Sequence, residues 1–172
     1  MCSSDLSVES VSVERETIIA APPATVWRFL TDPRRATRWM GLNASFDPRP
    51  GGSYRVEVIP GATASGTFIE IDPARRLVIT WGWEGDRGTV PPGSTTVIFE
   101  LIPRGDGTVL RLIHRDLPTV EAAASHSSGW RHYIERFAVA ASGADPGRDP
   151  WIDDPPAFAR EGDNDEDEGR FA

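Results

Sequence analysis

The sequence predicts an α+β domain in which a curved antiparallel sheet wraps around one long C-terminal helix. Six stretches between residues 42 and 115 alternate apolar and polar side chains with a period of two, and short turns rich in Pro and Gly separate them. Because links this short join neighbouring strands in antiparallel fashion, the stretches form a meander. Residues 119–141 have the period of a helix that is roughly 35 Å long, enough to cover one face of such a sheet.

One strand and two short helices come before the meander. Residues 12–20 alternate as an edge-type strand. Pro22-Pro23 then opens a helix, because a proline in the first turn loses no hydrogen bond, and Asp32-Pro33 ends it. A second short helix over residues 34–40 places Trp39 near the first.

The later strands are predicted at residues 42–47, 53–59, 63–71, 77–83, 95–102 and 108–115. Alternation gives three of them an inward face, made of Leu77, Ile79, Trp81 and Trp83, of Val97, Phe99 and Leu101, and of Leu110, Leu112 and His114. Strand 63–71 is ambiguous because Phe68 and Glu70 oppose Ile69, and a bulge near Gly66 could exchange the two faces. Glu70 is therefore either a surface carboxylate or a buried polar group of the interior.

The inner face of the long helix is partly polar. At 100° per residue, the residues that fall within about 60° of Trp130 are Ala123, His126, Ser127, Tyr133, Ile134 and Phe137. A histidine and a serine lie among small residues, and large aromatic residues occur only in the second half. This mixture predicts a helix that covers a partly polar interior.

Charge and composition divide the chain into three parts. The net charge is −8, and residues 144–172 carry ten acidic residues and three Arg, whereas the first 143 residues are nearly neutral. The acidic, Pro-rich end cannot bury a core, so we expect a disordered tail at 144–172, in which Trp151, Phe158 and Phe171 could anchor a partner. A flexible N-terminus at 1–10 and one domain at 11–143 make up the remainder.

Several function classes do not fit this composition. A nearly neutral domain without an Arg cluster offers little positive charge for binding nucleic acid. The sequence also contains no run of eighteen apolar residues, which a membrane-spanning helix would need. The N-terminus lacks the basic and apolar regions of a signal peptide, so we expect a cytoplasmic protein. The single Cys2 leaves no internal disulfide, and His126 and His132 lie too far around the helix to share a metal. We therefore expect neither a metal nor a cofactor.

Four segments appear in a telling order: PGGSYRVEV, IDPARRLVITWGW, GDGTVLRLIH and, in the long helix, HSSGWRHYIERFA. Over residues 13–141 this order resembles the SRPBCC or START-like superfamily, also called helix-grip. It is most similar to the family named after the activator of the heat-shock-protein ATPase. The resemblance implies a sheet of about seven strands and an interior cavity beneath the C-terminal helix, often holding an apolar or aromatic ligand. It does not imply one function, because members resemble lipid carriers, polyketide cyclases, stress proteins and co-chaperones.

Inward aromatic residues and two histidines form the candidate site. The aromatic side chains either stack a flat ligand or fill the core, and the resemblance favours the ligand. His114 and His126 could contact a ligand or move a proton, although such a histidine is more often hydrogen-bonded within a core. The predicted ligand-binding residues are Trp39, Phe68, Glu70, Trp81, Trp83, Phe99, His114, His126, Trp130, Tyr133 and Phe137. No residue is predicted to be catalytic.

We therefore expect a small-molecule binding module that holds an apolar or aromatic, lipid-like or polyketide-like molecule. One alternative is a cyclase- or hydrolase-type enzyme in the same cavity, which needs convergent acid–base groups. The other is a co-chaperone-like interaction or stress-response module, which needs an exposed apolar patch. We expect a monomer or a homodimer, with the acidic tail available to a protein partner.

Overall fold

The computed structural model describes residues 11–85 and 90–157, and within them seven strands form an antiparallel sheet in the order β1-β7-β6-β5-β4-β3-β2. The strands are β1 (Val11–Ile19), β2 (Asn43–Phe46), β3 (Ser53–Ile59), β4 (Ala62–Asp72), β5 (Arg76–Trp81), β6 (Thr95–Arg104) and β7 (Gly107–Leu117). The helices are α1 (Pro23–Thr31), α2 (Pro33–Ala36), α3 (Val120–Ala141) and α4 (Pro150–Asp153). The predicted α+β class and the order of its elements are confirmed.

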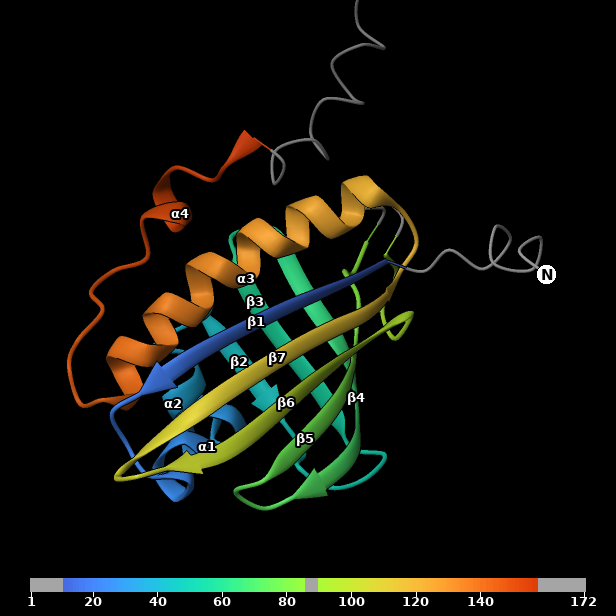
Figure 1. Ribbon diagram of the computed structural model, residues 1–172. Coiled ribbons are helices and arrows are strands. Elements are labelled where there is room, and N and C mark those ends of the chain that lie inside the picture. Colours follow the sequence, from blue (N-terminus) through green and yellow to red (C-terminus); the bar gives the residue numbers. More distant parts are fainter. Residues whose placement is uncertain (1–10, 86–89, 158–172) are drawn as a thin grey trace, which may run out of the picture.

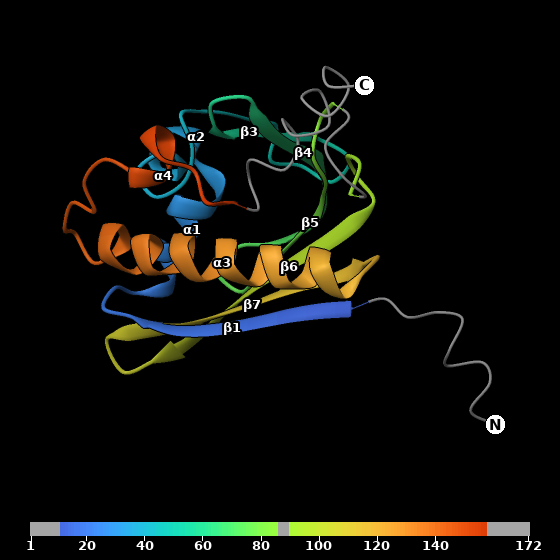
Figure 2. The ribbon, with the colours of Figure 1, turned by 90° about the horizontal axis from the view of Figure 1, so that it is seen from above.

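The sheet curls around α3, which runs between the β1–β7 side and the β3–β4 side of the curl (Figures 1 and 2). The strand in closest contact with α3 is β1. Thr119 caps the helix, since its Oγ1 accepts the Ala122 N–H at 3.0 Å. The buried face of α3 consists of Ala123, Trp130, Tyr133, Ile134, Phe137, Ala140 and Ala141. The inner stripe predicted from the helical period is therefore largely buried.

A bulge in β4 decides the orientation of the ambiguous strand. Phe68 pairs with Ile79, and the next paired residue of β4 is Glu70, so Ile69 is the extra residue. Phe68 is consequently fully buried, whereas Glu70 points outward and forms an ion pair with Arg76 at 3.0 Å. The expected bulge exists, but it lies after Gly66.

Gly66 has a different role, because a Cβ atom there would lie 2.0 Å from the carbonyl oxygen of Thr80. Strands β4 and β5 can approach this closely only at glycine.

The second short helix also differs from the prediction, since α2 ends at Ala36 and a turn follows it, in which the Trp39 N–H donates to the Ala36 carbonyl. Trp39 is nevertheless buried beside α1, as expected.

Residues 144–157, which we call the C-terminal strap, pack on α3, although a disordered tail was expected from Ala144 onward. Asp149 is only 3% exposed, and its carboxylate accepts the Tyr133 hydroxyl at 2.7 Å and lies 2.8 Å from His132 Nε2. The Trp151 ring stacks on the His132 ring at a centroid distance of 3.7 Å. The packing could not be predicted from the composition of residues 144–157, because the side chains that hold this segment belong to α3.

Arg136 fixes the beginning of the strap. It donates to the Trp39 carbonyl from Nε at 3.1 Å and to the Gly147 carbonyl from Nη2 at 2.7 Å. The strap lies on the side of α3 that faces away from β1 (Figure 2). The flexible N-terminus predicted at 1–10 and the tail beyond residue 157, with Phe158 and Phe171, lie outside the described residues.

Candidate functional site

The predicted aromatic and histidine side chains of the strands meet those of α3 in the interior. Trp81 lies in the middle, with its ring centroid 5.2 Å from that of Trp130 and 5.5 Å from that of Trp83. The rings of His114 and His126 are 4.9 Å apart. We call this group the ring cluster; its members are Trp81, Trp83, Phe99, His114, His126 and Trp130.

His114 is fully buried in β7, and both of its ring nitrogens have partners. Its Nδ1 lies 2.9 Å from Trp130 Nε1, and because an indole N–H only donates, Nδ1 is the acceptor. The proton is therefore assigned to Nε2, which donates to Thr95 Oγ1 at 2.8 Å, and Thr95 Oγ1 donates to the Trp81 carbonyl. Burial, assisted by the nearby His126, lowers the pKa of His114 to about 2.

His126 has the opposite tautomer. Its Nε2 accepts the Trp83 Nε1–H at 3.0 Å, so its proton is on Nδ1 and is donated to the Ala122 carbonyl at 2.7 Å. Burial lowers the pKa of His126, and the Ala122 hydrogen bond partly opposes this shift. Both histidines are therefore neutral, and both ring nitrogens of each are hydrogen-bonded. His126 orients Trp83, and His114 orients Trp130. In this arrangement neither offers a free ring nitrogen to a reacting group.

Two buried side-chain nitrogens of the described residues lack a hydrogen-bond partner: Trp81 Nε1 and Arg15 Nε. Both are donors. Arg15 lies on the inner face of β1 and its Nη2 donates to Ser127 Oγ of α3 at 2.6 Å. Sequence reasoning missed Arg15, although its alternation with the buried Val13 and Ile19 was the available signal.

The other predicted residues lie outside the ring cluster. Phe137 contacts Trp39, at a centroid distance of 4.7 Å, near the C-terminal end of α3. Tyr133 turns to Asp149 of the strap. Phe68 packs against Tyr54, a residue that sequence reasoning missed and whose ring lies 6.1 Å from that of Trp81. Glu70 does not belong to the interior, because the bulge in β4 turns it to the outer surface.

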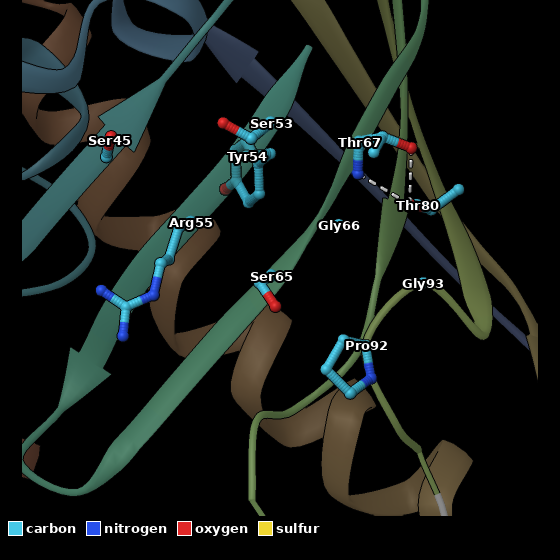
Figure 3. A pocket seen from close by; sticks show the side chains of 10 residues that line it. All are labelled: Ser45, Ser53, Tyr54, Arg55, Ser65, Gly66, Thr67, Thr80, Pro92 and Gly93. Atoms are coloured by element: carbon cyan, nitrogen blue, oxygen red, sulfur yellow. Dashed lines mark hydrogen bonds between the residues drawn. The ribbon is translucent and has the colours of Figure 1, made fainter. Parts of the chain in front are cut away.

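A separate hollow of about 520 Å³ lies on the outer side of the sheet, and its lining includes Ser and Thr side chains of β2, β3, β4 and β5 (Figure 3). Thr67 N–H and the Thr67 hydroxyl both contact Thr80 Oγ1, at 2.8 and 3.2 Å. The one charged side chain of the lining, Arg55, already pairs with Glu84 at 2.8 Å. The hollow is therefore a different place from the predicted ligand site.

Within residues 11–85 and 90–157, no three His, Cys, Asp or Glu side chains are grouped so that they could hold a metal ion. In the same part of the chain, no helix is sufficiently long and apolar to cross a membrane.

A curved antiparallel sheet that grips a long C-terminal helix over an aromatic interior defines a helix-grip domain. The chain belongs to the family described as Activator of Hsp90 ATPase homolog 1-like protein, whose family model matches residues 20–142. The family resemblance of the sequence is thereby confirmed. The comparison with curated proteins found no match.

The solved structures to which this chain is similar include the following three. The AHSA1-like protein of Rhizobium etli is 47% identical, with a TM-score of 0.67 over 83% of this chain and 89% of its own. CalU16 of Micromonospora echinospora is 27% identical, with a TM-score of 0.61 over 78% of this chain and 86% of its own. DynU16, a protein of the dynemicin biosynthetic locus, is 26% identical, with a TM-score of 0.69 over 80% of this chain and 49% of its own.

Proposed function

We propose that this protein is a binding module for a small apolar or aromatic molecule that carries a hydrogen-bond acceptor. The molecule binds between the sheet and α3, against the ring cluster. The observation that supports this most directly is the indole N–H of Trp81, which is buried without an acceptor among the described residues.

The unpaired indole N–H has a thermodynamic meaning. Leaving a buried donor unsatisfied costs about 1–3 kcal/mol, and most buried polar groups therefore have a partner. The neighbouring indoles are both occupied, since Trp83 donates to His126 and Trp130 donates to His114. A carbonyl or hydroxyl oxygen of a ligand would pair with Trp81, and the ring faces would cover the apolar remainder of the molecule.

Entry of a ligand requires the rings to separate, and Trp83 is the ring best placed to move. It lies beyond the end of β5, is joined to β4 by an isolated bridge at Ala64, and is only partly buried. Among the described residues, its indole N–H has one hydrogen bond, to His126. Moving Trp83 would open a path to Trp81 without unpairing the regular strands.

Family membership and one neighbour also support a small-molecule ligand. The neighbour DynU16 belongs to a biosynthetic locus, although this chain spans only about half of it. The enzyme alternative finds less support, because both interior histidines already use both ring nitrogens.

The test compares 9-fluorenone with fluorene, two flat probes of nearly equal shape that differ by one carbonyl oxygen. We expect saturable binding of both to the full chain, with fluorenone tighter by about fivefold or more, as one net hydrogen bond allows. Trp81→Phe keeps an aromatic ring and removes the N–H, so it should bring the two affinities within about twofold of each other. Trp27→Phe, outside the ring cluster, is the matched control and should preserve the difference.

Absence of saturable binding of either probe would contradict the proposal. The co-chaperone-like alternative would then gain weight. The exposed apolar patch that this alternative requires is best matched on the outer face of the sheet, where Ile18 and Ile102 are 61% and 46% exposed on either side of Val109.

A further inference from the structure

We propose that Arg15 binds an anionic group of the ligand, so that the molecule held in the interior is an aromatic acid. This inference rests on the proposed function, because it adds an anion subsite to the same interior. It identifies a specificity-determining residue and narrows the class of ligand from apolar molecules with an acceptor to those with a negative charge.

The position of Arg15 is unusual for an arginine. In β1 the side chains of Val13 and Ile19 are buried, and Arg15 shares their face because it lies an even number of residues from each. Its partner in β7 is Leu112, which is fully buried. From this inner surface the guanidinium reaches α3, where Nη2 donates to the hydroxyl of Ser127 at 2.6 Å and to its carbonyl at 3.2 Å.

The charge of Arg15 is not neutralised by the described part of the chain. None of the described carboxylates forms an ion pair with it. The adjacent Glu14 points to the other face of the sheet and pairs with Arg111 at 2.7 Å. Ser127 supplies only a hydroxyl and a carbonyl, and Arg15 Nε is buried with no acceptor within residues 11–85 and 90–157. A part-buried cation without a counter-ion is costly, and an anion placed at Nε would offset that cost.

Arg15 and the ring cluster belong to one continuous interior. Ser127 directly follows His126, whose ring contacts those of Trp83 and His114. Val13, two residues from Arg15, pairs with His114 in β7. One ligand can therefore place its flat body against the ring cluster while an acidic substituent reaches the guanidinium.

The chemical class follows from the unpaired groups. The two buried side-chain atoms without partners in the described residues are both donors, and one of them, Arg15 Nε, carries a positive charge. A matching molecule offers two acceptors. One is a carbonyl or hydroxyl oxygen for Trp81, and the other is a carboxylate, phenolate or similar anion for Arg15, which guanidinium groups bind well.

The experiment uses two fluorescent probes that share one skeleton, N-phenyl-1-naphthylamine, which is neutral, and 8-anilinonaphthalene-1-sulfonate, which is anionic. We expect the full chain to bind the sulfonate at least tenfold more tightly than the neutral probe. Arg15→Gln should weaken binding of the sulfonate about tenfold and that of the neutral probe less than twofold. Arg15→Lys, which keeps the charge, should restore part of the loss. Arg28→Gln, at an exposed position of α1, is the charge-matched control and should change neither affinity.

Each outcome separates the two proposals. If both probes bind equally and Arg15→Gln changes neither, the anion subsite is overturned while the binding module stands. If Arg15→Gln weakens both probes equally, Arg15 is only a tie between β1 and α3, and the subsite is again overturned. If neither probe binds, the proposed function fails, and the subsite fails with it. Thermal unfolding of each variant verifies that the fold is retained.

Discussion

Replacing Asp149 by Ala should weaken the attachment of the C-terminal strap to α3 and destabilise the domain. The Asp149 carboxylate is 3% exposed and accepts three contacts, from the Tyr133 hydroxyl, from His132 Nε2 and from the Trp151 backbone N–H. Burial, with the Asp149 carboxylate as the next cause, raises the pKa of Tyr133, so its hydroxyl keeps its proton and remains a donor at neutral pH. The variant leaves this buried hydroxyl without an acceptor.

The magnitude follows from these contacts. An unsatisfied buried hydroxyl costs about 1–3 kcal/mol, and hydrogen bonds to a charged group contribute about 1.5–3 kcal/mol. Because these figures overlap, we expect a loss of about 3 kcal/mol in the free energy of unfolding. For a chain of 172 residues this corresponds to a fall of about 6–12 °C in Tm.

Urea unfolding and differential scanning calorimetry of the full chain measure the effect. Asp153→Ala is the matched control in the same segment, because Asp153 forms an exposed ion pair with Arg148 and its loss should stay below about 0.5 kcal/mol. A loss below 0.5 kcal/mol for Asp149→Ala, or equal losses for the two variants, would refute the packing of the strap.

Further predictions concern how the two interior histidines affect the stability of the fold. The folded protein lowers the pKa of His114 and His126, so below about pH 6.5 the unfolded chain binds more protons and stability falls by up to about 1.4 kcal/mol per histidine per pH unit. Urea unfolding at pH 7 and 5.5 should show this decline, and His126→Gln should reduce it; an unchanged pH dependence would contradict the assignment. Trp130→Phe keeps the ring but leaves His114 Nδ1 without its donor, so it should lose about 1–3 kcal/mol in the same assay, and no loss would show that the bond is absent.

Much of the fold is local and was therefore predictable. The period-two stretches, their glycine and proline turns and the helical period of α3 each reflect nearby residues, and they also bring Trp81, His114 and Trp130 to one interior. The alternation of inward and outward side chains along a strand is interrupted where a bulge adds an extra residue. The bulge at Ile69 reversed the orientation of Glu70, and nothing in the sequence locates such a bulge to the residue.

The residues that were missed depend on tertiary contacts. Arg15 lies on an inner face where arginine is rare, so the general preference of charged residues for the surface pointed the other way. Asp149 occurs in an acidic, Pro-rich segment that is typical of disorder, and its burial depends on His132 and Tyr133 of α3. Tyr54 was not predicted, because its ring contacts with Phe68 and Trp81 form only in the curled sheet.

The most direct test of the binding module is native mass spectrometry of the full chain purified gently from its own host. The account predicts a stoichiometric adduct of a few hundred daltons on the 18.8 kDa chain, which disappears on denaturation and is reduced in Trp81→Phe. A bare polypeptide mass under both native and denaturing conditions would contradict a resident ligand and leave the unpaired N–H of Trp81 without its proposed partner.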